Sequence, residues 1–319
     1  MYELPDIQQQ KDGFVKLPIE KVGVRNIKLP LKIRTKEGSF QSIVANISSY
    51  CNLVEDVKGI NMSRISRTLV ETMNGLGEEG GIENLNEFAF ALQRAHNTDN
   101  VFVKAEFVYL IQGKSPVTQL TSYESVSTIF ESTLSSTRLR NFLTIESTEM
   151  ALCPCSKEMS LLVNNLTKAE REELDSKVNN DLLCKIYKAG YGAHNQKSRV
   201  RVTVEIEEKL PTMWIEDIVG IIKNSASSPT FATLKRPDEK YVTEISFMGA
   251  FINENLQFVE VKGSGPKFVE DIARNVAKEL NDLLDVKIKD FVIVVNNQES
   301  IHSSDIEATA IMTAGRDLK

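Results

Sequence analysis

The sequence predicts an α+β fold of two successive ββααββ units, each an antiparallel sheet with helices on one face. Three observations support this prediction. Several runs alternate apolar and polar residues, as strands with one buried face do. Other runs place apolar residues at helical spacing. The order strand, strand, helix, helix, strand, strand then occurs twice along the 319 residues, as a repeat of expected elements and not of sequence identity.

The first unit is expected over residues 1–135. Its opening run alternates around Pro18 and Pro30, which suits a strand with breaks, and the next run is its expected antiparallel partner. Ser63 is a suitable cap for the first helix, which Gly75 and Gly77 would end. The expected elements are strands at 14–36, 40–54, 101–113 and 117–132 and helices at 63–76 and 84–97.

The second unit is expected over residues 136–319. Its expected elements are strands at 136–152, 199–209, 286–295 and 305–312 and helices at 213–226 and 266–284. Two stretches interrupt this order and are interpreted as insertions. Residues 157–190 contain a capped, charged helix start at Thr167. Residues 245–264 alternate on either side of Asn253-Glu254-Asn255, as a hairpin does.

Composition limits the class of protein. A hydrophobic content of 41% and a charged content of 26% are typical of soluble globular chains. The net charge of −6 argues against broad binding to nucleic acid or to anionic membranes. Four cysteines are too few for a disulfide framework. Because neither a signal peptide nor an apolar run of membrane-spanning length is evident, we expect a cytoplasmic protein.

Cys153 is the first candidate site residue. It follows an extended segment and precedes Pro154, so the chain leaves the strand at the thiol, where sites are usually built. We favour a metal ligand over a buried structural thiol, the commoner role of a single cysteine. In an extended stretch Cys155 would share a face with Cys153 and serve as a reserve thiol. Cys51 and Cys184 have no partner motif and are expected to be packing residues.

The chain has three histidines. His194 lies just before an expected strand, where a ligand and a loop imidazole bonded to backbone are equally compatible with the sequence. His302, beside Ser300 in a loop between two strands, is either a proton shuttle or a solvated turn residue. His96 ends an expected helix, where the helix dipole favours a cation, and is interpreted as structural.

Two glutamates and four cations complete the candidates. Glu239 follows Lys235-Arg236-Pro237 and, taken alone, fits a solvated charge run. Glu270 opens an expected helix, where the dipole stabilises any acid. Four cations either bind phosphate or are simply solvated: Arg64, Lys197, Lys235 and Arg236.

Taken together, these segments resemble the type IB GTP cyclohydrolases, a tunnelling-fold family. The matching segments are Leu-Pro-Asp-Ile-Gln (4–8), Glu-Lys-Val-Gly-Val (20–24), Lys-Gly-Ile-Asn-Met-Ser-Arg (58–64), Ala-Leu-Cys-Pro-Cys-Ser-Lys-Glu (151–158), Gly-Ala-His-Asn-Gln-Lys-Ser (192–198), Lys-Arg-Pro-Asp-Glu-Lys (235–240), Phe-Val-Glu-Asp (268–271) and Glu-Ser-Ile-His (299–302). The resemblance implies a tandem tunnelling fold, two ββααββ units per chain, in an oligomeric barrel that is usually a homotetramer.

The resemblance also implies residue roles. Cys153, His194 and Glu239 would hold a divalent metal, and such a donor set tolerates zinc, manganese or ferrous iron. Glu270 would anchor the guanine, and His302 would act as an acid and base. The reaction would convert GTP and water to 7,8-dihydroneopterin triphosphate and formate, a product that enters folate or 7-deazaguanine synthesis.

The sequence departs from the family pattern in three places. The spacings from Cys153 to His194 and from Glu239 to Glu270 are longer than usual, because the two insertions fall there. Asn61 stands where many relatives carry histidine, although some share the asparagine.

Three alternatives stay open at this point. An archaeal-type relative would make a cyclic phosphate of dihydroneopterin. A nitrile reductase of the same fold would use Cys153 as nucleophile with NADPH. A non-catalytic binding protein would show no turnover.

Overall fold

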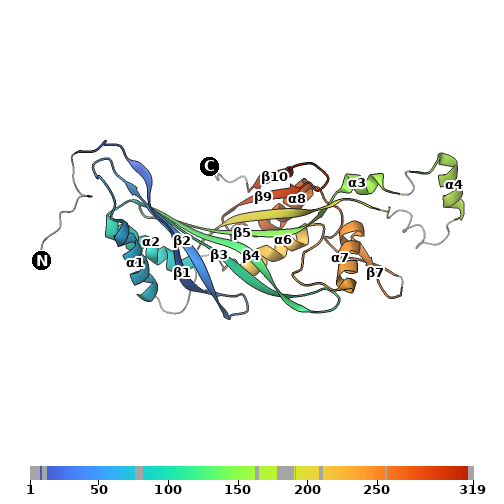
Figure 1. The fold of residues 1–319 in the computed structure, drawn as a ribbon, viewed down its shortest axis with the longest axis horizontal. Coiled ribbons are helices and arrows are strands. Elements are labelled where there is room, and N and C mark those ends of the chain that lie inside the picture. Colours follow the sequence, from blue (N-terminus) through green and yellow to red (C-terminus); the bar gives the residue numbers. More distant parts are fainter. Residues whose placement is uncertain are drawn as a thin grey trace.

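A computed structural model describes residues 8, 13–75, 82–161, 165–177, 190, 192–207, 211–255 and 257–314 of the chain. One long, twisted sheet runs through the molecule, and helices lie along it (Figure 1). Within these described residues, no helix is long and apolar enough to span a membrane.

The main sheet has eight strands in the order β1-β2-β3-β4-β5-β6-β9-β10, and every neighbouring pair is antiparallel. Its strands are β1 Ile19–Arg34, β2 Phe40–Leu53, β3 Asn100–Lys114, β4 Thr121–Ser135, β5 Arg138–Leu152, β6 Asn195–Ile206, β9 Asp290–Gln298 and β10 Glu307–Thr313. The expected α+β class with mainly antiparallel strands is therefore confirmed. β4 pairs with β5, so the strands on either side of residue 135 form one continuous sheet. The unit boundary at that residue stays a prediction.

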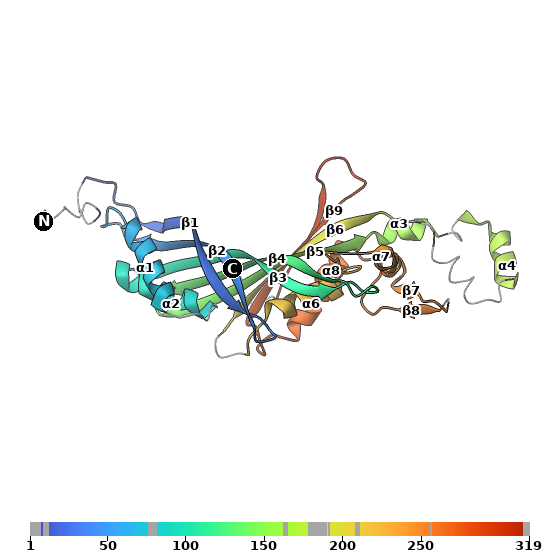
Figure 2. The same cartoon turned by 60° about the horizontal axis from the view of Figure 1, so that its bottom comes forward.

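Helices cover one face of the sheet. α1 (Met62–Gly75) and α2 (Ile82–His96) lie toward the β1 end, and α6 (Ile215–Ser225) and α8 (Val269–Asn281) lie under β5, β6 and β9 (Figures 1 and 2). The buried faces of strands and helices form one core that spans both groups of helices, with Phe88, Leu92, Ile145, Ile218 and Phe291 among its fully buried members. Alternating burial along β4 and β6 shows why the sequence pattern predicted these strands.

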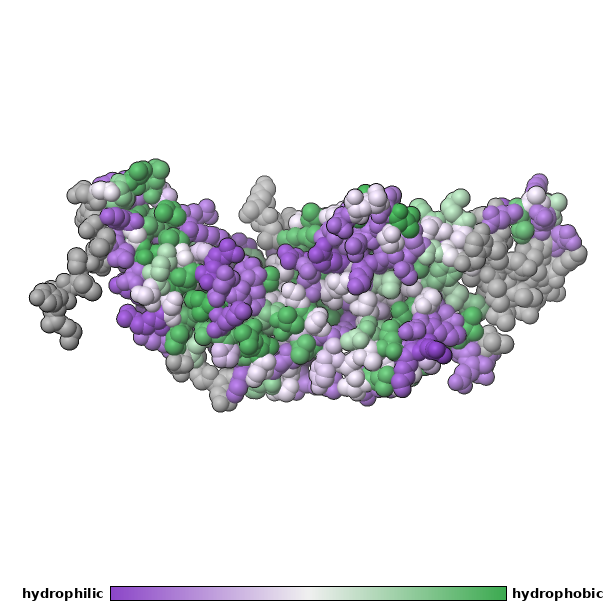
Figure 3. Space-filling view, in the orientation of Figure 1, coloured by the Kyte–Doolittle hydropathy of each residue, from purple (hydrophilic) through white to green (hydrophobic). Residues whose placement is uncertain are grey.

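The helix-free face of the sheet is more mixed. Val44, Val108 and Ile311 are large apolar residues that stay exposed on their strands. In the orientation of Figure 1, which also shows the helices, hydrophilic and hydrophobic residues are interspersed over the surface (Figure 3).

One glycine is required by close approach of two strands. Where β1 and β2 pair, Gly23 lies opposite Tyr50, and a Cβ added to Gly23 would lie 1.9 Å from the carbonyl oxygen of Ser49. Any side chain at Gly23 would collide with backbone atoms that cannot move independently of the ladder.

Some expected boundaries were wrong. The chain turns into a short helix, α3 (Pro154–Met159), directly after Cys153. A further helix, α7 (Arg236–Met248), was not expected, because its first turn resembles a solvated charge run. The hairpin around Asn253 is present but small, as β7 (Ala250–Ile252) and β8 (Phe258–Glu260), since residues up to Met248 belong to α7. β4 begins at Thr121, because the expected residues before it form the turn after β3.

The insertion after α3 contains the expected capped helix, α4 (Lys168–Lys177), which lies beyond α3 at the end of the molecule (Figure 1). Its cap is reciprocal. The backbone N–H of Thr167 donates to Glu170 at 2.7 Å, and the N–H of Glu170 donates to the Thr167 hydroxyl at 3.3 Å.

Candidate active site

Cys153 and His194 lie side by side at the ends of two paired strands. The β5–β6 ladder ends with Leu152 opposite Asn195, and one step further the N–H of Cys153 donates to the carbonyl oxygen of His194 at 3.2 Å. Both side chains are half-buried. The two residues are therefore adjacent although an insertion lies between them in the sequence, as the resemblance requires.

Cys153 is also the N-cap residue of α3. Its sulfur accepts a hydrogen bond from the N–H of Ser156 at 3.5 Å, and Pro154 begins the helix. Proline is favoured in the first turn of a helix, because the N–H that it lacks would have no intrahelical partner. The Cys-Pro pair thus ends the strand, starts the helix and fixes the thiol at the junction.

Two serines that the sequence analysis did not select hold His194. Its backbone N–H donates to the hydroxyl of Ser156 at 3.1 Å, and its ring Nδ1 lies 3.4 Å from the hydroxyl of Ser300. Because Nδ1 is engaged, Nε2 is the ring nitrogen available to a metal or to a proton. Both serines occur inside segments that match the family, so the match of the segment could have indicated them, whereas the residue type could not.

His302 is two residues beyond Ser300 in the same loop. Its side chain is exposed, and its backbone N–H donates to the carbonyl oxygen of Glu299 at 3.3 Å. The carboxylate of Glu299 in turn accepts from the side chain of Gln196 at 3.0 Å. These contacts fasten the loop to β6 beside His194, so His302 belongs to this end of the sheet.

Glu270 lies in the first turn of α8, exposed to solvent. The start of that helix is tied to the cysteine strand, because the N–H of Lys267 donates to the carbonyl oxygen of Leu152 at 3.1 Å. The ammonium of Lys267 contacts three further carbonyl oxygens, those of Ser225, Ala226 and Gly263. Burial lowers the pKa of Lys267 to about 8. The region just before Glu270 is thereby fixed relative to Leu152.

Glu239 is not grouped with Cys153 and His194 in the single chain. It is exposed in the first turn of α7, whose start binds the turn between β3 and β4. There the buried Asp238 accepts from the N–H groups of Val117 and Thr118, each at 2.8 Å, and from the Thr118 hydroxyl at 2.5 Å. Among the described residues, no three His, Cys, Asp or Glu side chains form a group able to hold a metal ion.

Cys153 and His194 nonetheless suit two ligand positions of a metal site. A thiol and an imidazole are both ligands of borderline metals such as zinc. Cys153 and His194 are adjacent, half-buried and held by hydrogen bonds, so the metal prediction fits these two residues. Glu239 opens α7, which contacts α3 in the same chain through Lys157 and the ring of Phe247.

The four candidate cations lie at both ends of the molecule. Lys197, Lys235 and Arg236 are exposed, the first on β6 opposite Met150 and the others at the start of α7. Arg64 belongs to α1, at the opposite end from α3 in both ribbon views (Figures 1 and 2). Its guanidinium donates to the carbonyl oxygen of Ala95 at 3.1 Å. Arg64 therefore does not share a site with Cys153 in one chain.

The remaining cysteines correct one expectation and support another. Cys155 lies inside α3 and not in an extended stretch, so the reason for pairing it with Cys153 was wrong. Cys51 is fully buried, and burial raises the pKa of its thiol to about 12, as suits a packing residue. Cys184 falls outside the described residues.

His96 ends α2 as expected, but the physical reason given for it was wrong. Burial and the nearby Arg64 both lower the pKa of His96, so the site favours neutral imidazole and not the cation that a helix C-terminus would stabilise.

Comparison with known proteins identifies the class. The profile of the family described as type I GTP cyclohydrolase folE2 matches residues 4–308. A GTP cyclohydrolase FolE2 of Dictyoglomus thermophilum is 33% identical over 298 residues, covering 93% of this chain and 94% of the relative. The FolE2 protein of Magnetococcus marinus is 31% identical over 300 residues, covering 94% and 92%. Among solved structures, a uricase from Arthrobacter globiformis has a TM-score of 0.48 at 7% identity and covers 94% of each chain.

The family match over residues 4–308 and the FolE2 relatives that cover most of the chain define a protein of the GTP cyclohydrolase class. The protein belongs to the type I GTP cyclohydrolase folE2 family, whose reaction is hydrolysis of GTP to dihydroneopterin triphosphate and formate.

Proposed function

We propose that this chain hydrolyses GTP at the strand ends that carry Cys153 and His194, using a divalent metal that these two residues hold together with Glu239. The adjacency of Cys153 and His194 carries the proposal, because two residues far apart in sequence meet at a backbone hydrogen bond of 3.2 Å. When bound, the metal would make water more acidic and so supply hydroxide near neutral pH.

The neighbouring residues have roles that follow from their positions. His194 is oriented by Ser300 through Nδ1, which directs Nε2 away from that loop. His302, exposed in the same loop, is placed to carry protons between solvent and a substrate during the several later steps of the rearrangement. Glu270, in the first turn of α8, accepts hydrogen bonds from the amide and amino groups of guanine, which selects GTP over ATP.

We propose that the site is completed in a homo-oligomer, usually a tetramer in proteins of this kind. One observation supports this. Arg64, on α1, lies at the opposite end of the molecule from α3 (Figures 1 and 2). A triphosphate carries several negative charges, which suit Lys197, Lys235 and Arg236 from one chain and Arg64 from another. We expect such an enzyme to work in the cytoplasm.

Zinc, manganese and ferrous iron all suit a thiolate, imidazole and carboxylate set, so we propose a divalent metal of this group. The metal used in the cell depends on availability as much as on affinity.

The test is formate release and pteridine fluorescence from GTP, measured on metal-stripped protein re-supplied with each metal in turn. Cys153→Ala should reduce turnover by at least about a thousandfold, since it removes a group on which the chemistry depends. Cys155→Ala is the matched control, because that thiol is exposed two positions away and should retain activity. Turnover retained by Cys153→Ala would contradict the assignment.

Product analysis separates the remaining alternatives. Linear dihydroneopterin triphosphate supports the proposal, and a cyclic phosphate indicates the archaeal-type reaction. Absence of turnover with every metal would favour a binding protein on this fold.

A further inference from the structure

The residues that lead into α8 are bonded to the segment that borders the end of β5. Ser227, which is fully buried, lies at the centre of this arrangement. Its N–H donates to the carbonyl oxygen of Met150 at 3.0 Å, and its hydroxyl accepts from the N–H of Leu152 at 3.1 Å. Its own carbonyl oxygen accepts from the N–H of Gly265 at 2.9 Å. The start of α8 and the strand that ends at Cys153 therefore share one support.

Lys267 joins the start of α8 to the ends of both β5 and α6. Its N–H donates to the carbonyl oxygen of Leu152 at 3.1 Å. Its ammonium donates to the carbonyl oxygen of Ser225 at 2.9 Å and contacts those of Ala226 and Gly263. Ser225 is the last residue of α6 and Ala226 is its C-cap, where carbonyl oxygens lack intrahelical partners and the helix dipole favours a cation. An ammonium has three protons, so these three oxygens occupy the group and leave none for phosphate.

Glu270 follows in the first turn of α8 and has no such support of its own. Its side chain is exposed, and its carboxylate has neither a hydrogen bond nor an ion pair with any other described residue. The neighbouring Asp271 differs, because its carboxylate accepts from the N–H of Phe268 at 3.0 Å and closes the first turn. The position of the Glu270 carboxylate therefore depends on the backbone of this turn, which Lys267 holds.

We propose that Lys267 is a positioning residue for guanine recognition, which places the Glu270 carboxylate relative to the end of β5. This inference rests on the proposed function, in which Glu270 accepts hydrogen bonds from the amide and amino groups of guanine. Without the ammonium, the first turn of α8 loses its contacts with the end of α6. A carboxylate on a loosened turn no longer meets both donors of the base at once, so selectivity for guanine falls.

Calorimetric titration with GTP and with inosine triphosphate tests the proposal, because inosine triphosphate lacks only the 2-amino group of guanine. The full-length protein is stripped of metal, so the measured affinity is independent of turnover. We expect the parent to bind GTP about tenfold more tightly, since one hydrogen bond to a charged group separates the two ligands. Lys267→Met keeps the apolar stem and removes the ammonium, and this preference should fall to about twofold or less.

Lys267→Arg is a second variant, which keeps the positive charge at the end of α6. A planar guanidinium cannot direct its protons to three oxygens grouped around one ammonium, so we expect a folded protein whose preference for GTP falls about threefold. Circular dichroism shows whether each variant is folded. If Lys267→Met does not fold, Lys267→Arg decides the result.

Arg140→Met is the matched control for a general loss of stability. Arg140 lies near the start of β5, at the other end of the strand from Leu152. Its guanidinium donates to the carboxylate of Glu205 at 2.8 Å and 2.7 Å, so the variant also loses charge-assisted hydrogen bonds. We expect Arg140→Met to keep the parent's preference for GTP.

A double variant tests whether Lys267 acts through Glu270. Glu270→Ala should abolish the preference for GTP by itself. Adding Lys267→Met to Glu270→Ala should then change the ratio of the two affinities no further, because the residue that Lys267 positions is already absent.

Four results would overturn the proposal. A parent that binds both nucleotides equally removes Glu270 as the guanine anchor, and the role of Lys267 with it. The parent's preference retained by the folded variants at Lys267 shows that the ammonium does not matter. An equal loss in Arg140→Met shows only lower stability, and a further loss in the double variant shows action by another route. If the preferences are as expected but no formate is released from GTP, the role of Lys267 stands and the proposed hydrolysis fails.

Discussion

At the scale of single residues, three hydrogen bonds hold Cys153 and His194 beside each other. The N–H of Cys153 donates to the carbonyl oxygen of His194, and the sulfur of Cys153 accepts from the N–H of Ser156. The N–H of His194 in turn donates to the hydroxyl of Ser156. The three contacts form a closed set around two candidate ligands. The bond between Cys153 and His194 continues the ladder of β5 and β6, so the two candidate ligands are attached to the end of the sheet.

Gly23 gives the sharpest stability prediction for a single residue. Gly23→Ala should lower the free energy of unfolding by about 3 kcal/mol or more, because its Cβ would lie 1.9 Å from the carbonyl oxygen of Ser49. Urea unfolding followed by circular dichroism measures this.

Gly220→Ala is the control. Gly220 lies within α6 with open space around it, so alanine should raise the free energy of unfolding by about 0.5–1 kcal/mol through helix propensity. Equal stability of the two variants would refute the close contact at Gly23.

At the scale of elements, α7 depends on its docking to the turn between β3 and β4. Asp238 is fully buried and accepts bonds from Val117, Thr118 and the N–H of Lys235. Burial alone would raise the pKa of Asp238, but the hydrogen bonds from Thr118, Lys235 and Val117 outweigh it and hold the pKa well below its usual range. The ionised carboxylate therefore fixes the helix that carries Glu239.

The stability of the protein should depend on this carboxylate in acid. A depressed pKa in the folded state contributes stability above the unfolded value of about 4, and that contribution is lost as pH falls from there toward the folded pKa. Asp238→Asn should therefore lower the melting temperature at pH 7 and flatten its decline below pH 4.

Melting curves at a series of pH values check this, with Asp56→Asn as the control, since Asp56 is exposed and paired with Lys16. If Asp238→Asn has the parent's melting temperature at pH 7, the hydrogen bonds of Asp238 contribute nothing to the stability of the protein.

At the scale of the whole molecule, the single sheet separates two sets of predicted site residues. Arg64 on α1 and Cys153 beside α3 lie at opposite ends of the chain (Figures 1 and 2). If both serve one reaction, the site must combine two copies.

Mixing two inactive variants tests this arrangement. Cys153→Ala and Arg64→Gln should each lose activity alone, but hetero-oligomers assembled from both should regain part of it, because some sites would then have two intact halves. GTP turnover after mixed refolding gives the answer, with each variant refolded alone as its control. Activity that stays absent in correctly assembled mixtures would place both residues in the same copy's site.

Sequence alone predicted the strands of the main sheet well, because burial alternates along β4 and β6. It also predicted the helices that cover the sheet, because apolar residues follow helical spacing in α1 and α8. It missed α7, whose first turn of Arg236, Pro237 and Asp238 is also a normal helix start. It missed the helical turn at Cys155 for a similar reason, since Pro154 was interpreted as a strand end without a following helix.

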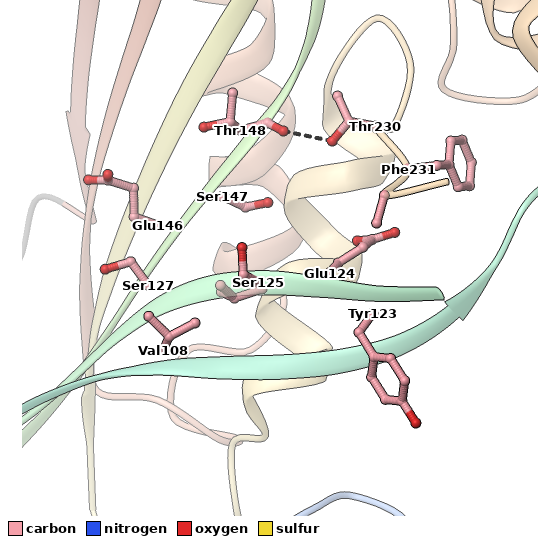
Figure 4. Close-up of a pocket in the computed structure, with 12 residues that line it drawn as sticks. Val108, Tyr123, Glu124, Ser125, Ser127, Glu146, Ser147, Thr148, Thr230 and Phe231 are labelled. Carbon is pink, nitrogen blue, oxygen red and sulfur yellow. Dashed lines mark hydrogen bonds between the residues drawn. The ribbon is translucent and has the colours of Figure 1, made fainter. Parts of the chain in front are cut away.

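The site could be predicted only in part. Cys153 and His194 were found from their segments, but their adjacency depends on the β5–β6 register, which no local pattern reveals. Ser156 and Ser300 were missed, because a serine that orients a neighbour has no signature of its own in the sequence. A pocket lined by Glu124, Glu146 and Phe231, beyond the point where the pairing of β4 with β5 ends, was also unpredictable, because it depends on where that pairing stops (Figure 4).

The most direct test of the central claim is the absorption spectrum of the metal-stripped protein titrated with cobalt(II). A thiolate ligand to cobalt gives an intense charge-transfer band in the near ultraviolet. We predict this band in the parent protein and in Cys155→Ala, and its loss in Cys153→Ala. A band that persists in Cys153→Ala, or that disappears only in Cys155→Ala, would contradict the assignment of Cys153 as the metal ligand.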